Sequence, residues 1–236
     1  MNKTLVFTAT YNEIDNIEIL IREIFKYSKE VDILIIDDNS PDGTGKLLEN
    51  LKIKYQNLEV IIRERKMGLD TAHKLAFNYA KEKKYDHLIT MDADLSHSPS
   101  IIPKMIDLLK NNEFVIGSRY IKGGKCNMSL PRLLLSIVGN KIIKFVLAIK
   151  CNEFTTSFRA FNFNKIKNFD MNLVESKGYS FFMETIYLLS IDNNILEIPI
   201  SFENRKYGNS KIPSEEIYRT LINLFKIWFK NKKKVW

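Results

Sequence analysis

Hydrophobic and polar positions follow two alternating patterns along the first half of the chain. Short, nearly unbroken aliphatic runs predict buried strands at residues 4–8, 31–37, 58–62, 87–91 and 113–117. Apolar residues at helical spacing predict helices at residues 16–27, 71–83 and 99–110, and another through Leu51 after the turn at residues 40–43. Aliphatic strands without alternation are typical of a sheet that is covered on both faces. We therefore expect an α/β fold with a mainly parallel sheet flanked by helices.

The second half of the chain has a different pattern. Gly123 and Gly124 mark a flexible break. Beyond it, the spacing predicts helices at residues 131–149, 180–189 and 217–236 and a strand at residues 195–202. The sequence contains no internal repeat and no low-complexity linker. We expect a single domain over residues 1–236, with the later helices as C-terminal elaborations.

Polar side chains gather where several of the predicted strands end. Ligands of open parallel sheets bind beyond the carboxyl ends of the strands, so these residues are expected at one rim. They are Tyr11, Glu13, Asp37, Asp38, Asp92 and Asp94.

Asp92 and Asp94 carry the most specific chemistry of this rim. They flank Ala93 directly after a strand, so both carboxylates can approach one divalent cation together with substrate oxygens. Mg²⁺ and Mn²⁺ prefer such oxygen ligands, and a cation there would neutralise a diphosphate leaving group. The alternative is a pair of solvated aspartates in a turn.

Composition and charge narrow the class of protein. Apolar residues make up 45% of the chain and charged residues 27%, which permits a packed core and argues against disorder. The formal net charge of +8 suits an anionic membrane surface or a phosphorylated substrate, although a solvated lysine-rich surface would give the same value. No aromatic and basic motif of a nucleic-acid-binding module is present, so we expect no nucleic-acid partner.

Cysteine usage and hydropathy bear on the compartment. Cys126 and Cys151 have neither metal-site spacing nor a disulfide framework, which favours a reduced, cytoplasmic setting. The N-terminus does not have the pattern of a signal peptide. No uninterrupted apolar run reaches the length of about 18 residues that a spanning helix needs.

Eight segments together resemble one known family. They are TYNE at residues 10–13, IDDNSPDGT at 36–44, KMGL at 66–69, MDADLSH at 91–97, GSRY at 117–120, TTSFR at 155–159, Gly178-Tyr179 with Glu184, and RKYGNSK at 205–211. In this order and spacing, the chain resembles the dolichol-phosphate mannose synthase branch of the family-2 glycosyltransferases. The resemblance implies a GT-A fold and inverting transfer of a hexose, most simply mannose from GDP-mannose, to a polyprenyl or dolichyl phosphate. Residues 1–120 would then form the nucleotide-sugar-binding half, and residues 121–236 an acceptor-binding and membrane-facing half.

The resemblance also assigns roles to individual residues. Base and ribose would be held by Tyr11, Glu13, Asp37 and Asp38, and the metal ion with the donor phosphates by Asp92 and Asp94. The acceptor phosphate would be held by Arg119, Arg132 and Ser136. A loop with Arg205 and Lys211 would close over the donor diphosphate. The catalytic set is then Asp94, Arg119, Arg205 and Lys211. The structural alternatives are core packing for Tyr11, helix capping for Asp37 or Asp38, and surface ion pairs for the arginines.

A phosphate acceptor removes the need for a catalytic base. Its second pKa is about 6, so its oxygen is already a nucleophile at neutral pH. The protein must then position two anions and stabilise the leaving diphosphate. His97 is expected to have a supporting or structural role, and His73 and His87 are incidental.

The acceptor would place the protein at a bilayer. The helices predicted at residues 131–149 and 217–236 combine apolar faces with lysines, which suits peripheral contact with the cytoplasmic face of a membrane. The alternatives are that both helices cover the core or that a membrane protein is the partner.

Several positions depart from the residues usual in the family. They are Ala9, Asp70, Ser96, Glu153 and Ser157. These departures leave the donor and acceptor open. UDP-glucose is an alternative donor, and a sugar hydroxyl is an alternative acceptor, for which Glu153 or Glu184 would be recruited as a base. A non-catalytic nucleotide- or membrane-binding module is the remaining alternative.

Overall fold

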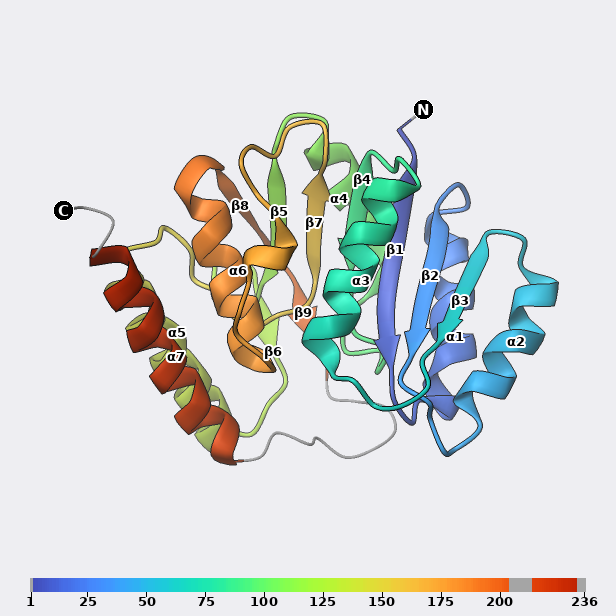
Figure 1. The fold of residues 1–236 in the computed structure, drawn as a ribbon, viewed down its shortest axis with the longest axis horizontal. Helices are drawn as coiled ribbons and strands as arrows, with labels where there is room; N and C mark the ends of the chain where they lie inside the picture. Colours follow the sequence, from blue (N-terminus) through green and yellow to red (C-terminus); the bar gives the residue numbers. More distant parts are fainter. Residues whose placement is uncertain (1, 204–213, 233–236) are drawn as a thin grey trace.

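The chain folds around a seven-stranded sheet (Figure 1). The computed structural model describes residues 2–203 and 214–232. The strand order is β3-β2-β1-β4-β7-β5-β8. The strands are β1 (Thr4–Thr10), β2 (Asp32–Asp37), β3 (Leu58–Ile62), β4 (His87–Thr90), β5 (Phe114–Ser118), β7 (Arg159–Asn162) and β8 (Ile195–Pro199). Strands β1 to β4 are parallel to their neighbours in the first half, as the aliphatic runs predicted.

The two faces of the sheet carry separate hydrophobic cores. On β1, Leu5 and Phe7 belong to one core and Val6 to the other, because successive side chains of a strand point to opposite faces. The first core includes residues of α3 (Leu69–Glu82) and α6 (Tyr179–Asp192), and the second those of α1 (Ile14–Tyr27), α2 (Thr44–Lys54) and α4 (Ile102–Leu109). The prediction of a doubly covered, mainly parallel sheet is confirmed.

Strand β7 was not predicted from the sequence, and it decides how the site is built. It is antiparallel to both neighbours and lies between β4 and β5, with Thr90 opposite Arg159. Four residues are too few to show a strand period, and a buried Arg159 at the start of the strand breaks the apolar pattern. Its insertion brings the segment before it next to the end of β4.

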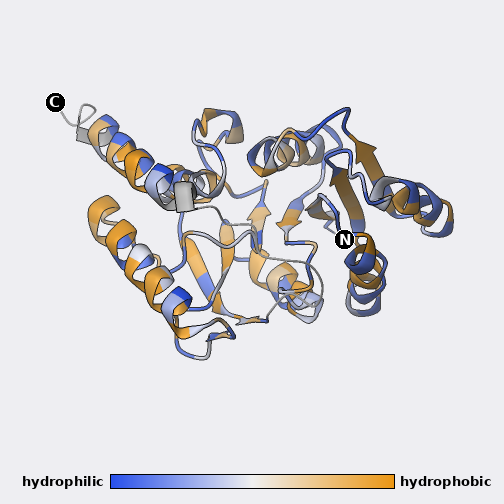
Figure 2. Ribbon diagram, turned by 90° about the horizontal axis from the view of Figure 1, so that it is seen from below, coloured by the Kyte–Doolittle hydropathy of each residue, from blue (hydrophilic) through white to orange (hydrophobic). Residues whose placement is uncertain are grey.

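The C-terminal half adds helices beside the sheet edge formed by β8. Helix α5 (Leu130–Leu147) and α6 both pack against α7 (Ser214–Lys232) (Figures 1 and 2). The predicted strand at residues 195–202 is divided into β8 and a short β9 (Ser201–Phe202), which pairs with β6 (Lys125–Cys126). The single-turn helices η1 (Pro99–Ile101) and η2 (Met171–Leu173) complete the fold. Within the described ranges, none of the helices has the length and apolar character that crossing a membrane requires.

Helices α5 and α7 only partly cover the core. Ile143 and Leu147 of α5 and Leu224 and Ile227 of α7 are buried in it. Many other apolar side chains of the two helices are exposed, and we call this set the α5–α7 apolar face. It consists of Leu130, Leu134, Leu135, Val138, Ile142 and Phe145 on α5 and Tyr218, Leu221, Ile222, Phe225 and Phe229 on α7. Figure 2 shows the two helices at one end of the molecule, with α5 as a largely hydrophobic ribbon and α7 as a ribbon in which hydrophobic and hydrophilic stretches alternate.

The buried His73 makes stability depend on pH. It packs edge-on against Phe7 and Phe182, and burial, with a smaller contribution from the charge of Arg159, lowers its pKa to about 3. An unfolded histidine titrates near 6.5, so acid favours the unfolded state between these values. Stability should therefore fall as the pH drops from about 6.5 towards 3, by at most ~1.4 kcal/mol per pH unit for this group.

We expect His73→Leu to reduce this acid sensitivity. The measurement is the free energy of unfolding in urea at a series of pH values between about 4.5 and 7.5. The lower values lie inside the window of about 3 to 6.5 in which His73 affects stability, and the values above about 6.5 give the reference outside it. Other buried histidines leave a residual slope in the variant. Identical slopes in wild type and variant would show that His73 is not the group responsible.

Candidate active site

The rim of polar residues predicted from the sequence exists in the structure. Strand β1 lies between β2 and β4, so the loops that follow these three strands are neighbours. Each loop contains one residue other than glycine with a positive φ, namely Asn12, Asn39 and Leu95. Such residues are costly in the left-handed region and are held there by surrounding contacts. The loop after β2 also contains Gly43 with a φ of +92°, so both a glycine and residues held by their contacts shape the rim.

Asp37 organises the loop after β2. Its carboxylate accepts hydrogen bonds from the hydroxyl of Thr10 (2.8 Å), the hydroxyl of Ser40 (2.6 Å) and the backbone N–H of Ser40 (2.9 Å). The side chain is fully buried. These contacts lie within the loop, and the next helix, α2 (Thr44–Lys54), has Gly43 at its N-cap without a side-chain cap, so the helix-capping alternative for Asp37 is wrong. Its predicted contact with a nucleotide base stays a prediction.

Asp38 holds a second loop at the same rim. One carboxylate oxygen accepts the backbone N–H groups of Met67 (3.1 Å) and Gly68 (2.9 Å), and the carboxylate forms a buried ion pair with Arg63. Arg63 in turn donates to the carbonyl oxygen of Gly68 (3.1 Å). The sequence did not single out Arg63, whose position directly after β3 was the available signal. Asp38 thus ties the loops after β2 and β3 together.

Tyr11 and Glu13 lie at the opening of the same rim. The ring of Tyr11 is 3.8 Å, centroid to nitrogen, from the ammonium group of Lys66. The carboxylate of Glu13 accepts a hydrogen bond from the side chain of Asn16 (2.7 Å), and its backbone N–H donates to the hydroxyl of Thr44 (3.1 Å). The structure therefore brings these residues beside Asp37 and Asp38, as the strand ends predicted.

Asp92 and Asp94 differ in accessibility. The side chain of Asp92 is 37% exposed, whereas Asp94 is only 4% exposed. One oxygen of Asp94 accepts hydrogen bonds from the backbone N–H (3.0 Å) and the hydroxyl (2.6 Å) of Ser96. One oxygen of Asp92 accepts the hydroxyl of Ser157 (2.6 Å). Asp92 therefore presents the more accessible carboxylate of the two.

His97 supports the loop that contains Asp92. Its Nδ1 accepts the backbone N–H of Asp92 (3.3 Å), which assigns the ring proton to Nε2, 3.3 Å from the hydroxyl oxygen of Thr156. The ring stacks on Phe158. Burial lowers the pKa of His97, and the nearby carboxylate of Asp92 offsets this only in part. His97 is neutral at physiological pH, which fits the expected supporting role.

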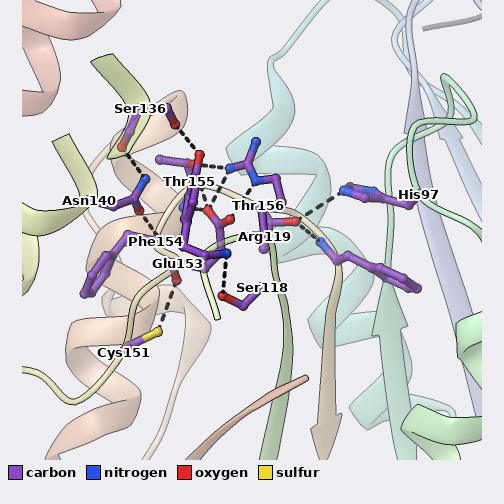
Figure 3. A network of polar contacts seen from close by, with 12 residues as sticks. His97, Ser118, Arg119, Ser136, Asn140, Cys151, Glu153, Phe154, Thr155 and Thr156 are labelled. Atoms are coloured by element: carbon purple, nitrogen blue, oxygen red, sulfur yellow. Dashed lines mark hydrogen bonds and ion pairs between the residues drawn. The ribbon is translucent and has the colours of Figure 1, made fainter. Parts of the chain in front are cut away.

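Arg119 is locked in a buried ion pair. Its Nε and Nη2 donate to the two carboxylate oxygens of Glu153 (2.7 and 2.8 Å), and Nη2 also donates to the hydroxyl of Thr155 (2.9 Å) (Figure 3). Burial raises the pKa of Glu153, but the Arg119 charge and hydrogen bonds more than offset this, so the pKa lies below its ordinary value. From the sequence, Glu153 was identified only as a departure from the residue usual in the family and as an alternative base. Its pairing with Arg119 was not predicted.

The other predicted acceptor residues lie on α5. The hydroxyl of Ser136 is hydrogen-bonded to that of Tyr120 (2.6 Å), next to Arg119 in the sequence, and Arg132 is exposed one turn earlier. A cavity of about 360 Å³ lies between α5 and the segment after β5, and Arg119 is among its lining residues. Arg205 and Lys211 lie outside the described residues.

The carboxylates fit a metal ion that a substrate helps to coordinate. Among the described residues, no group of three or more histidine, cysteine or acidic side chains is arranged to enclose a metal. Mg²⁺ and Mn²⁺ sites of nucleotide-using enzymes characteristically combine one or two carboxylates with substrate phosphates. Asp92 with Asp94 meets this requirement, because the hydroxyl of Ser157 orients one carboxylate and Ser96 the other.

Comparisons with known proteins identify the family to which the sequence is similar. The family model described as "Glycosyl transferase family 2" matches residues 5–169. The undecaprenyl-phosphate mannosyltransferase of Micrococcus luteus is 31% identical over 224 residues, which cover 94% of this chain and 92% of that protein. The polyprenol monophosphomannose synthase of Mycolicibacterium smegmatis is 33% identical over 227 residues, covering 94% and 85%.

Solved structures resemble the chain in fold. Glucosyl-3-phosphoglycerate synthase from Mycobacterium tuberculosis, in complex with Mn²⁺, UDP and glucosyl-3-phosphoglycerate, superposes with a TM-score of 0.63 at 16% identity, covering 96% of this chain and 80% of that chain. A mannosyltransferase from Pyrobaculum calidifontis in complex with GDP-mannose and Mn²⁺ gives a TM-score of 0.57 at 14% identity, covering 96% and 70%. The predicted sheet architecture is the one these proteins share.

Proposed function

The chain belongs to glycosyl transferase family 2, and we propose that it transfers mannose from GDP-mannose to a polyprenyl phosphate with inversion at the anomeric carbon. The observation that carries this proposal is the identity of 31% and 33%, over 94% of the chain, to two polyprenyl-phosphate mannosyltransferases. These matches cover more of the chain than the family model, which ends at residue 169, so the likeness extends beyond the nucleotide-binding strands.

The donor is assigned to the rim at the ends of β1, β2 and β4. Tyr11, Glu13 and the loops that Asp37 and Asp38 organise would enclose the base and ribose. Asp92 and Asp94 would hold Mg²⁺ or Mn²⁺ with the diphosphate, and the bound cation would supply Lewis-acid stabilisation of the leaving group. The partly exposed carboxylate of Asp92 supports this assignment.

The contacts that occupy the two candidate base carboxylates support a phosphate acceptor. A sugar hydroxyl would need a base, and Glu153 and Glu184 were the candidates. Glu153 is engaged with Arg119, and Glu184 accepts the backbone N–H groups of Glu175 (3.0 Å) and Ser176 (2.6 Å). A lipid phosphate is already ionised and needs no such base. Its oxygen forms the new bond to the anomeric carbon while the bond from that carbon to the diphosphate breaks, releasing GDP.

Cationic side chains would counter the repulsion between the acceptor phosphate and the donor diphosphate. Arg119 at the end of β5 and Arg132 and Ser136 on α5 are assigned to the acceptor phosphate, and Arg205 and Lys211 to the donor diphosphate. Positioning and electrostatic stabilisation are the main resources for such a reaction. The cavity beside Arg119 supports the placement of the acceptor on the α5 side.

The assay that tests the function compares donors and acceptors. Labelled GDP-mannose and UDP-glucose are each incubated with polyprenyl phosphate, with the neutral polyprenol and with an oligosaccharide, in the presence of Mg²⁺ or Mn²⁺. We expect label in the lipid phosphate from GDP-mannose alone. Label transferred from UDP-glucose would show that the proposed donor is wrong, and label found only in the oligosaccharide would show that the proposed acceptor is wrong. The absence of any transfer would favour the alternative of a non-catalytic binding module.

The α5–α7 apolar face is assigned to the membrane. A lipid acceptor requires the protein to approach a bilayer, and exposed lysines such as Lys141 and Lys226 accompany the apolar side chains. Such a combination suits the interface of an anionic, cytoplasmic membrane face. A membrane protein covering the same face is the alternative partner.

Phe145→Asp is expected to weaken membrane binding. Phe145 is 87% exposed, and burying such a side chain is worth roughly 1.5–3 kcal/mol. Binding to vesicles with anionic phospholipid should therefore fall by about 10-fold or more, measured by co-sedimentation. Ile53→Asp is the control, because Ile53 is 85% exposed on α2 at the opposite end of the sheet (Figure 1). Equal binding of both variants and the wild type would reject the assignment.

A further inference from the structure

Residues 153–157 lie between the two halves of the site, and we call them the bridging segment. They directly precede β7, whose antiparallel pairing with β4 places Arg159 opposite Thr90. The hydroxyl of Thr90 also donates to the carbonyl oxygen of Ser157. The end of β4, which leads into Asp92, is therefore attached directly to the bridging segment. Figure 3 shows the segment in the centre of a polar network.

The C-terminal end of the bridging segment contacts the proposed metal site. The hydroxyl of Ser157 donates to a carboxylate oxygen of Asp92 (2.6 Å). The hydroxyl of Thr156 is 3.3 Å from Nε2 of His97, and that ring accepts the backbone N–H of Asp92 through its other nitrogen. The side chain and the backbone of Asp92 are thus both tied to the segment.

The N-terminal end of the bridging segment contacts the proposed acceptor site. Glu153 binds Arg119 through both carboxylate oxygens, and the hydroxyl of Thr155 accepts from Arg119 (2.9 Å) and donates to Glu153 (3.0 Å). These contacts use Nε and Nη2 of the guanidinium, so Nη1 is the nitrogen not committed to the segment. The rotation of Arg119, and with it the direction of Nη1, is therefore set by Glu153.

The backbone of the bridging segment is itself held from several sides. The N–H of Phe154 donates to the side chain of Asn140 on α5 (2.8 Å). The buried guanidinium of Arg159 donates to the carbonyl oxygens of Thr156 (2.8 Å) and Phe154 (3.1 Å). A backbone fixed in this way can present Glu153 and Ser157 at a constant separation, as preorganised sites require.

We propose that the bridging segment sets the geometry between the donor and acceptor sides, with Glu153 as the positioning residue for Arg119 and Ser157 as the positioning residue for Asp92. This inference rests on the proposed transfer to a lipid phosphate. Bond formation needs the acceptor oxygen within about 3–3.5 Å of the anomeric carbon, and a misplacement of ~1 Å can cost about 100-fold in rate. Five residues that hold a group on each side supply the required alignment.

Two variants four residues apart test the proposal. In Glu153→Gln, the acceptor KM should rise by about 10-fold, while the KM for GDP-mannose and the affinity for Mn²⁺ change less than about 2-fold, since a charge-assisted pair that orients Arg119 is lost. In Ser157→Ala, the affinity for Mn²⁺ in the presence of GDP should fall by about 3- to 10-fold with an unchanged acceptor KM. The reason is that a hydrogen bond to a metal-binding carboxylate orients it and so raises its affinity for the ion. Mn²⁺ binding is measured from the free-ion EPR signal, independently of turnover.

A shorter carboxylate provides the rescue test, and a milder variant guards against misfolding. Glu153→Asp keeps the charge and should recover part of the acceptor KM. If Glu153→Gln is unfolded in a thermal melt, Thr155→Val replaces it, because it removes only a hydroxyl from Arg119 and should raise the acceptor KM by about 2- to 5-fold, in line with the loss of one hydrogen bond.

The outcomes separate this inference from the function on which it rests. A wild-type protein that transfers no sugar to lipid phosphate overturns the proposed function. If the wild type is active but each variant changes donor, metal and acceptor parameters alike, the bridging segment is only structural and this inference is overturned. An unchanged acceptor KM in the folded Glu153 or Thr155 variant overturns it as well.

Discussion

Asp92→Asn is expected to lower kcat/KM for sugar transfer by about 10³-fold, which corresponds to ~4 kcal/mol of transition-state stabilisation. Asp92 is the more accessible carboxylate of the pair, whereas Asp94 is buried against Ser96. Removing its charge weakens the coordination of the cation that the leaving diphosphate needs. The asparagine oxygen can still accept the hydroxyl of Ser157, so the loop should keep its conformation.

The measurement pairs initial rates with Mn²⁺ binding in the presence of GDP. Both should fall in Asp92→Asn, while the thermal unfolding midpoint stays close to that of the wild type. Asp107→Asn is the matched control, because Asp107 is a well-exposed carboxylate on α4. Transfer at the wild-type rate by Asp92→Asn would remove this carboxylate from the catalytic site and, with it, the proposed metal position.

Arg119→Met is expected to lower the free energy of unfolding by about 3–5 kcal/mol, because it leaves a buried carboxylate without its partner. Glu153 is 0% exposed, and both of its oxygens are engaged by Arg119. The guanidinium of Arg119 is almost as deeply buried. Burial lowers its pKa, but the charge and hydrogen bonds of Glu153 raise the pKa by more, so the pair is fully ionised. The same variant should lose most of its activity, since Arg119 is assigned to the acceptor phosphate.

A double-mutant cycle separates stability from activity. Replacing both partners, in Arg119→Met with Glu153→Gln, should recover much of the stability in urea unfolding, because no uncompensated charge remains. Activity should not recover. As a control, breaking the exposed pair of Lys110 and Asp107 should cost less than about 1 kcal/mol. Strictly additive effects of the two single substitutions would show that the pair is not coupled.

The fold was largely predictable because burial leaves a local signature. The strand at residues 58–62 was predicted with the bounds that β3 has, and those of β1, β2, β4 and β5 were close. Strand β7 was missed because it has four residues and includes a buried arginine. A short strand shows no period, and its place between β4 and β5 depends on partners distant in the sequence.

The candidate site was predictable only as a set of residues. The sequence placed Tyr11, Asp38 and Asp92 at strand ends, and the parallel order of β2, β1 and β4 brought these ends together. It did not reveal that Asp38 pairs with Arg63, nor that Asp92 is held by Ser157. Hydrogen-bond partners contribute no periodic pattern, so nothing local identifies them.

By itself, the sequence determined the layered α/β architecture, the rim where the carboxylates gather and the family resemblance. These properties follow from the regular spacing of apolar residues and from motifs contained within a few positions. Only the tertiary structure decided that Arg119 is paired with Glu153, 34 residues away, and that one short segment contacts both Arg119 and Asp92. The physical reason is that a buried charge must find its partner in space, and strand order rather than sequence distance decides which groups meet.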